Sequence, residues 1–127
     1  MKKLLVDSSI FIDFLRVKEK EKTPFFRLVK KNNQFYTSII VHTEIYSGKS
    51  VWKGEESYLE VENLFSGIKI LPITEEISKK VGELKANFMP DIVDAVLAAT
   101  ALLNKLTLVT LNIKDFNKIE ELKLYKI

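Results

Sequence analysis

The stretch LLVDSSIFID, residues 4–13, decides the fold. Its first three residues form a short run without a polar interruption, which is typical of a strand covered on both faces of a sheet. Ser8 and Ser9 are suitable caps for a helix that continues to about residue 17. A buried strand that passes directly into a helix predicts the first part of a β-α-β unit.

The same alternation continues along the chain. Further strands are expected at residues 35–37, 68–71, 106–109 and 122–125, which makes five in all. Helices are expected at residues 8–17, 24–31, 39–47 and 55–65, then from a Thr74 cap to about residue 88, and at 92–103 after an opening by Pro90 and Asp91. Strands separated by helices favour right-handed crossovers. The predicted fold class is therefore α/β, with a mainly parallel five-stranded sheet and helices on both faces.

Length and composition limit the classes of protein that remain. The 127 residues are enough for one compact domain, predicted to span residues 1–127, and the 46% hydrophobic content excludes a disordered chain. The absence of cysteine excludes disulfides and thiolate zinc sites, and a single histidine excludes a polyhistidine metal site. No apolar run approaches the ~18 residues that a membrane span needs. Asp7 comes too early for a signal-peptide core. A reducing, cytoplasmic setting is therefore expected.

The charge balance is mildly basic. Twenty Lys and Arg residues against seventeen Asp and Glu residues give a net charge of +3, which permits a polyanionic partner without requiring one. Arg16, Lys49, Lys53 and Lys114 are candidates for contacts with such a partner, although most lysines of the chain are expected to be solvated surface residues.

Four carboxylates follow predicted strands or lie close behind them. Asp7 ends the first strand, Glu44 lies on the helix after the second, Asp94 is in the first turn of an apolar helix, and Asp115 follows the fourth strand. Ligands of parallel sheets bind beyond the carboxyl ends of the strands. A carboxylate among apolar residues is costly to bury, and several of them converge only when a cation neutralises their repulsion. An all-oxygen site favours Mg²⁺ or Mn²⁺.

Each of these acids also has a structural interpretation, which the residues alone leave open. Asp7 could cap the first helix, Glu44 could be a solvated helix residue, Asp94 could be a first-turn acid favoured by the helix dipole, and Asp115 could be a turn residue. Asp91 is predicted to be a helix cap rather than a metal ligand.

Four segments of the chain resemble the motifs of PIN-domain ribonucleases. They are VDSSIFID at residues 6–13, TEIYSG at 43–48, DAVLAATA at 94–101 and LVTLNIKDF at 108–116. The segments occur in the order of that family, and the match covers essentially the whole chain. In length the chain resembles the VapC-type toxins of prokaryotic toxin–antitoxin pairs. The resemblance implies a three-layer α/β/α sandwich and an endoribonuclease that depends on Mg²⁺ or Mn²⁺.

The resemblance also assigns roles to individual residues. The acidic quartet of the family, which holds the metal and carries the catalysis, falls on Asp7, Glu44, Asp94 and Asp115. Polar positions that support it fall on Ser9, Thr110 and Asn112. The implied partners are RNA as substrate, a VapB-type antitoxin and a second copy of the chain. Binding of operator DNA would belong to the antitoxin, because the chain has no room for a DNA-binding module.

Other readings lead to different functions. A phosphoacceptor domain of the receiver type would need an acidic residue at the end of the third strand, and residues 68–74 contain none. A non-catalytic binding module with the same fold, and a housekeeping RNA-processing PIN nuclease, both remain open. Metal titration separates the first from an enzyme. A neighbouring antitoxin gene, or growth arrest that the partner relieves, favours the toxin.

Overall fold

The computed structural model describes residues 1–88 and 91–127. Within these residues the sheet has four strands, which are β1 (Lys2–Val6), β2 (Asn33–Ser38), β3 (Ile68–Leu71) and β4 (Thr107–Val109). They lie in the order β3-β2-β1-β4, and every neighbouring pair is parallel. The predicted parallel sheet is therefore confirmed.

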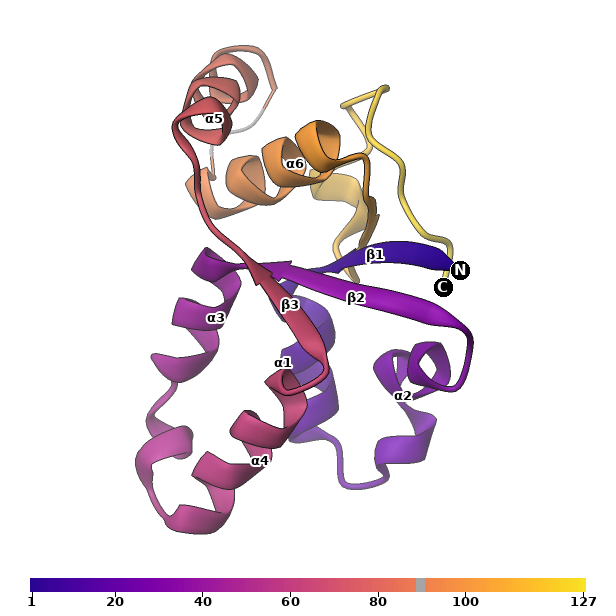
Figure 1. Ribbon diagram of the computed structural model, residues 1–127, viewed down its shortest axis with the longest axis vertical. Coiled ribbons are helices and arrows are strands. Elements are labelled where there is room, and N and C mark those ends of the chain that lie inside the picture. The colour runs from indigo at the N-terminus through magenta and orange to yellow at the C-terminus, as the bar shows by residue number, and fades with distance from the viewer. Residues whose placement is uncertain (89–90) are drawn as a thin grey trace.

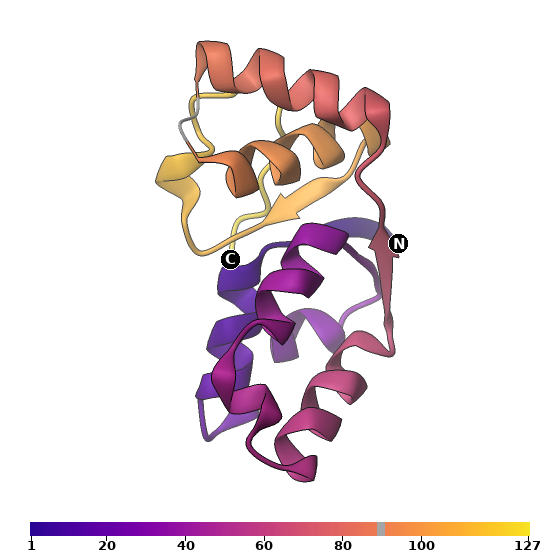
Figure 2. The same cartoon turned by 90° about the vertical axis from the view of Figure 1, so that its left-hand side faces the viewer.

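Helices cover both faces of this sheet. One layer contains α1 (Ser8–Arg16), α2 (Pro24–Val29), α3 (Ile39–Tyr46) and α4 (Glu55–Phe65), and the opposite layer contains α5 (Glu75–Asn87) and α6 (Ile92–Asn104) (Figures 1 and 2). Short 3₁₀ turns, η1 (Lys20–Lys22), η2 (Lys49–Trp52) and η3 (Ile113–Asp115), complete the described elements. The three-layer α/β/α arrangement is as predicted. Pro90, expected to open the last helix, lies outside the described residues.

The strand order reverses at β1. The chain moves outward from β1 to β2 and β3 through α1–α4, and then returns through α5 and α6 to place β4 on the other side of β1. Right-handed crossovers put helices on opposite faces when the direction reverses, which explains the two layers. A reversal of this kind opens a crevice at the carboxyl ends of the adjacent strands. In this chain those ends belong to β1 and β4.

The expected fifth strand at residues 122–125 is reduced to a single bridge. Leu124 pairs in parallel with Leu108. The Leu108 amide donates to the Lys123 carbonyl (2.8 Å), and the Tyr125 amide donates to the Leu108 carbonyl (2.9 Å). Because β4 has only three residues, its outer edge offers few groups for pairing, and the apolar pattern of residues 122–125 does not extend into a ladder.

The core lies on both sides of β1. Leu4, Leu5 and Val6 are fully buried, as the uninterrupted apolar run predicts. On one face Phe11 makes edge-to-face contacts with Phe25 and Phe65, with ring centroids 5.5 and 5.4 Å apart. Such contacts each add about 0.5–1.5 kcal/mol beyond the burial of area. On the other face α6 is buried at every residue from 95 to 101, which confirms the prediction of a deep helix.

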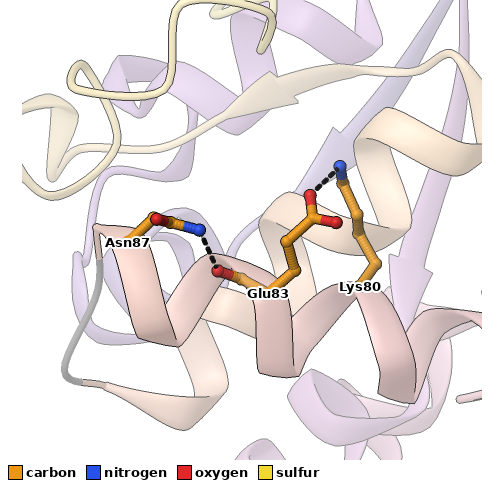
Figure 3. A network of polar contacts seen from close by, with 3 residues as sticks. All are labelled: Lys80, Glu83 and Asn87. Atoms are coloured by element: carbon orange, nitrogen blue, oxygen red, sulfur yellow. Dashed lines mark hydrogen bonds and ion pairs between the residues drawn. The ribbon is translucent and has the colours of Figure 1, made fainter.

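The outermost helix, α5, is set by its cap and its apolar stripe. The Thr74 hydroxyl accepts a hydrogen bond from the Ile77 amide (3.1 Å), as predicted for the N-cap. The partly buried Lys80 pairs with the exposed Glu83 (2.7 Å), and the Asn87 side-chain amide donates to the Glu83 carbonyl (2.8 Å) (Figure 3). A surface pair of this spacing contributes only a few tenths of a kcal/mol. Burial of the apolar stripe formed by Ile77, Val81 and Leu84 therefore holds α5 in place.

Candidate functional site

The Asp7 carboxylate is buried at the carboxyl end of β1. The residue is only 3% exposed. Thr110 and Ser9 donate their hydroxyls to Oδ2 (2.5 and 3.1 Å), and Ser8 donates its hydroxyl to Oδ1 (3.2 Å). Neutral hydroxyls therefore satisfy this carboxylate.

Asp7 occupies the N-cap position of α1, but its side chain makes no capping hydrogen bond. The simple capping interpretation is therefore wrong for this side chain. The expectation that Ser8 and Ser9 cap the helix is wrong as well. Both residues lie inside α1 and turn their hydroxyls toward Asp7.

The register of β1 against β4 explains why Thr110 reaches Asp7. Val6 pairs with Val109, and the Asp7 amide donates to the Val109 carbonyl (3.0 Å). The residues that follow the two strands, Asp7 and Thr110, therefore emerge side by side. Their backbone pairing brings together two positions that are 103 residues apart in the sequence.

The loop after β4 holds the hydroxyls of Ser9 and Thr110 through two backbone amides. The Leu111 amide donates to Ser9 Oγ (3.1 Å), and the Asn112 amide donates to Thr110 Oγ1 (3.0 Å). Each hydroxyl thus accepts from a backbone amide and donates to Asp7, so the direction of its proton is fixed. Asn112 contributes through its backbone, and in the described part of the chain its side chain forms no hydrogen bond. The same loop leads into η3, which carries Asp115.

Glu44 projects from α3, which begins directly after β2. The Ser38 hydroxyl caps this helix by accepting from the Ile40 amide (3.2 Å). Partial burial of the carboxyl raises the pKa of Glu44, and the negative charges of Asp7 and Asp91 raise it further. A hydrogen bond with Ser8 works in the opposite direction and lowers the pKa. Although Glu44 is an exposed residue, its carboxyl therefore interacts with the group around Asp7.

Asp94 lies in the first turn of α6. Asp91 is the N-cap of this helix and accepts from the Val93 and Asp94 amides (2.8 and 3.1 Å), which confirms its predicted capping role. Burial raises the pKa of Asp94 from its ordinary value to about 6. Smaller contributions to this rise come from the negative charges of Asp91, Asp7, Asp115 and Glu44. The other three carboxylates predicted from the sequence therefore lie close enough to act on Asp94.

No ion pair among the described residues involves these carboxylates. Across residues 1–88 and 91–127 the ion pairs are Lys22–Glu19 and Lys80–Glu83. Within the same residues, no three acidic or histidine side chains approach closely enough to enclose a metal ion. The donors are nevertheless the hard oxygens that Mg²⁺ and Mn²⁺ prefer. The group therefore fits a divalent cation in charge and chemistry, and binding requires the carboxylates to move closer together.

A family model for the PIN domain matches residues 4–122 of the chain. The chain belongs to the PIN domain family. Ribonuclease VapC19 of Mycobacterium tuberculosis is 26% identical to it over 124 residues, which cover 94% of this PIN domain protein and 96% of the relative.

Solved structures share the fold of this PIN domain. A chain of a toxin–antitoxin complex from Klebsiella pneumoniae superimposes with a TM-score of 0.77 at 26% identity. The match covers 98% of this chain and 99% of the chain in that complex. VapBC2 from Rickettsia felis, bound to a DNA fragment from its promoter, has a TM-score of 0.75 at 23% identity and 97% coverage of both chains. None of the helices in the described part of the chain is long and apolar enough to cross a membrane.

Ser8 is the residue of this PIN domain site that the sequence did not reveal. Its hydroxyl contacts Asp7 and also lowers the pKa of Glu44, so it connects the acid at the end of β1 with the acid of α3. A hydroxyl residue directly after a strand-ending Asp is the available signal. That signal was ambiguous, because serine is equally suited to capping a helix.

The four predicted basic residues are distributed unevenly around this site. Lys114 lies in η3 next to Asp115, whereas Arg16 ends α1, and Lys49 and Lys53 lie in or directly after η2. All four are exposed. Their proposed contact with a polyanion stays a prediction.

Proposed function

We propose that this PIN domain is an endoribonuclease that hydrolyses RNA phosphodiester bonds with Mg²⁺ or Mn²⁺. The observation that carries the proposal is the cluster of carboxylates around Asp7, near the ends of β1 and β4. Within the described residues, no ion pair neutralises their charge. Asp7 is buried and held by neutral hydroxyls. Burial raises the pKa of Asp94, and the charges of the neighbouring acids add to this rise. A fold that keeps like charges together in this way is suited to a cation. The likeness to Ribonuclease VapC19 supports RNA as the substrate class.

Asp7 and Asp94 are the direct ligands in this proposal, and Glu44 and Asp115 act directly or through water. A bound divalent ion screens the charge of the phosphodiester and lowers the pKa of a water molecule. Ser8, Ser9 and Thr110 orient Asp7. An ionised carboxylate has about four lone-pair sites, so three hydroxyl donors leave it capacity for a cation. Asn112 supports Thr110 through its backbone amide.

We further propose that the protein is the toxin of a VapBC-type pair. Support comes from the relative named VapC19 and from the toxin–antitoxin complexes that share its fold. In this proposal residues 1–127 form one domain in the cytoplasm, pair with a second copy, and bind a VapB-type antitoxin that supplies contact with operator DNA. Growth arrest on expression, relieved by co-expression of the product of a neighbouring small gene, is the expected result. A housekeeping nuclease would cause no such relieved arrest.

The nuclease itself is tested with purified protein and single-stranded RNA. Cleavage is expected with Mg²⁺ or Mn²⁺ and is expected to stop in EDTA. Asp7→Asn and Asp94→Asn should each abolish it while the far-ultraviolet circular dichroism spectrum stays unchanged. Asp13→Asn is the matched control, because Asp13 lies on α1, close to Asp7 in the sequence, and does not act on the pKa of Asp94. Cleavage that persists in both site variants would refute the proposal, and a wild-type protein that binds Mn²⁺ without cleaving would indicate a binding module.

A further inference from the structure

A basic surface lies at the edge of the sheet where the strands begin. Two adjacent hollows form it, with volumes of about 600 and 500 Å³. Tyr125 and Lys126 line both hollows, so the two lie side by side. We define the basic surface by the cations that line them, which are Lys2, Lys3, Arg27, Lys30, Lys31, Lys105 and Lys126.

Among the described residues, cations outnumber acidic side chains on the basic surface by seven to one. Glu21 is the one acidic side chain among the described residues that line the two hollows. Neither of the ion pairs found within residues 1–88 and 91–127 includes a cation of this surface. All these cations are exposed, so a mobile polyanion can reach them.

Aromatic rings stand beneath two of the lysines. Lys2 Nζ lies 5.0 Å from the centre of the Tyr125 ring, and Lys30 Nζ lies 5.1 Å from the centre of the Phe26 ring. The Tyr125 backbone amide donates to the Leu108 carbonyl (2.9 Å), which holds the ring where the hollows meet. Surfaces that bind single-stranded nucleic acid combine positive charge for the backbone with aromatic rings on which bases stack. Both hollows contain this combination.

The basic surface and the carboxylates occupy opposite edges of the sheet. Because all strands are parallel, their starts lie at one edge and Asp7 lies at the other, and both chain ends lie at the starting edge, on the right in Figure 1. At ~3.3 Å per residue, β1 separates Lys2 from Asp7 by about 16 Å. RNA that is cut at the carboxylates meets negative charge there, so its affinity must come from elsewhere on the protein.

We propose that the basic surface binds single-stranded RNA and anchors the substrate at a distance from the carboxylates. The choice of RNA as the polyanion rests on the proposed function. Phosphates contact the lysines, and a base stacks on Tyr125. Long substrates gain affinity from this anchor, and substrates too short to reach it do not.

The first test measures binding of a labelled single-stranded RNA of about 30 nucleotides by fluorescence anisotropy. EDTA is present, so binding is read without cleavage. The variant Lys3→Glu/Lys31→Glu/Lys126→Glu is expected to bind at least tenfold more weakly than the wild type. The slope of log affinity against log salt should fall by about 2, because each lost phosphate contact removes about 0.7.

A matched variant distinguishes the effect of the basic surface on RNA affinity from the effect of net charge alone. Lys18→Glu/Lys69→Glu/Lys79→Glu makes the same change in charge at exposed lysines that line neither hollow. It is expected to change the affinity by less than about threefold. Tyr125→Leu should weaken binding by about fivefold, and Tyr125→Phe, which keeps the ring, should not. Equal losses in the two charge variants would overturn the proposal, as would equal wild-type affinity for duplex DNA of the same length.

Cleavage of a trinucleotide with Mn²⁺ keeps this inference separate from the proposed function. The basic-surface variant should cleave the trinucleotide at the wild-type rate and lose activity only on the long RNA. Loss of trinucleotide cleavage in that variant would overturn the remote anchor. A wild type that binds long RNA as expected and cleaves nothing would refute the nuclease and leave the binding surface standing.

Discussion

The two edges of the sheet, one at the carboxyl ends of the strands and one at their starts, differ in the sign and in the burial of their charges. At the carboxyl edge, acids lie close together and partly buried, and burial raises the pKa of Asp94 to about 6. At the starting edge, lysines and Arg27 are exposed and line shallow hollows. Water screens separated, exposed charges, whereas burial and crowding make a charge expensive. Crowding of like charges therefore destabilises the fold at the carboxyl edge and not at the starting edge. A bound cation would relieve that repulsion at the carboxyl edge.

The largest expected effect is loss of cleavage at the acidic edge. Asp7→Asn and Asp94→Asn should each lower metal-dependent cleavage by more than about 100-fold, since even outer-shell partners of metal sites contribute about 10–100-fold. Glu44→Gln and Asp115→Asn should lower it less if they act through water. Initial rates on the trinucleotide measure this order. An equal effect of the basic-surface variant on the trinucleotide would break the contrast between the two edges.

Metal binding should also stabilise the fold, because a cation relieves the repulsion among the carboxylates. Saturating Mn²⁺ is expected to raise the melting temperature of the wild type, with a gain that grows with the ion concentration. Asp94→Asn should show little of this gain, whereas Asp13→Asn should keep all of it. Thermal unfolding with and without Mn²⁺ provides the measurement. A similar gain in all three proteins would place the ion elsewhere.

Stability without metal should fall as the pH rises through the range in which Asp94 ionises. The pKa of Asp94 is about 6 in the folded chain and 3.8 in its ordinary state. Between these pH values the folded state therefore binds more protons than the unfolded state. The resulting contribution to the free energy of unfolding is complete below about pH 4 and is lost above about pH 6. After allowance for solvent screening, we expect a loss of about 1 kcal/mol. The raised pKa of Glu44 acts in the same direction.

Denaturant unfolding in EDTA from pH 4 to 8 checks this dependence. Asp94→Asn should flatten the curve and be more stable than the wild type at pH 7. Asp13→Asn should reproduce the wild-type curve. A wild-type protein whose stability rises between pH 4 and pH 6 would contradict the sign of the effect.

The smallest predicted effect belongs to Ser8. Ser8→Ala removes the hydroxyl that contacts Asp7 and lowers the pKa of Glu44. Affinity for Mn²⁺ should fall by about tenfold, in the range for outer-shell partners, while the melting temperature of the metal-free protein stays nearly unchanged. Ser8→Thr keeps a hydroxyl and should restore the affinity. A change in melting temperature without a change in Mn²⁺ affinity would show that Ser8 serves only the helix.

Local patterns predicted most of the fold. The buried run 4–6, the Thr74 cap and the apolar helix after Asp91 each specify an element by their own residues, and α4 and β3 have the predicted bounds. The predicted strand at 122–125 was wrong in extent because its length depends on β4, a partner that offers only three residues. Short apolar runs do not report the length of their partners.

The candidate site was predictable to the level of its acids. Parallel topology brings strand ends together, so Asp7, Glu44, Asp94 and Asp115 could be grouped from their places in the sequence. The hydroxyl arrangement around Asp7 was less accessible, since the direction of the Ser8 hydroxyl depends on the fold around it. The basic surface could not be predicted from the sequence. Its residues run from Lys2 to Lys126, and the net charge of +3 carries no information on where they meet.

The bridge between Leu108 and Leu124 has a consequence for self-association. It occupies backbone groups on the outer side of β4 that an open sheet would offer to any passing extended segment. We expect a shortened chain that ends before residue 120 to expose the outer side of β4 and to form oligomers whose size grows with concentration. Residues 123–125 therefore cover one border of the sheet.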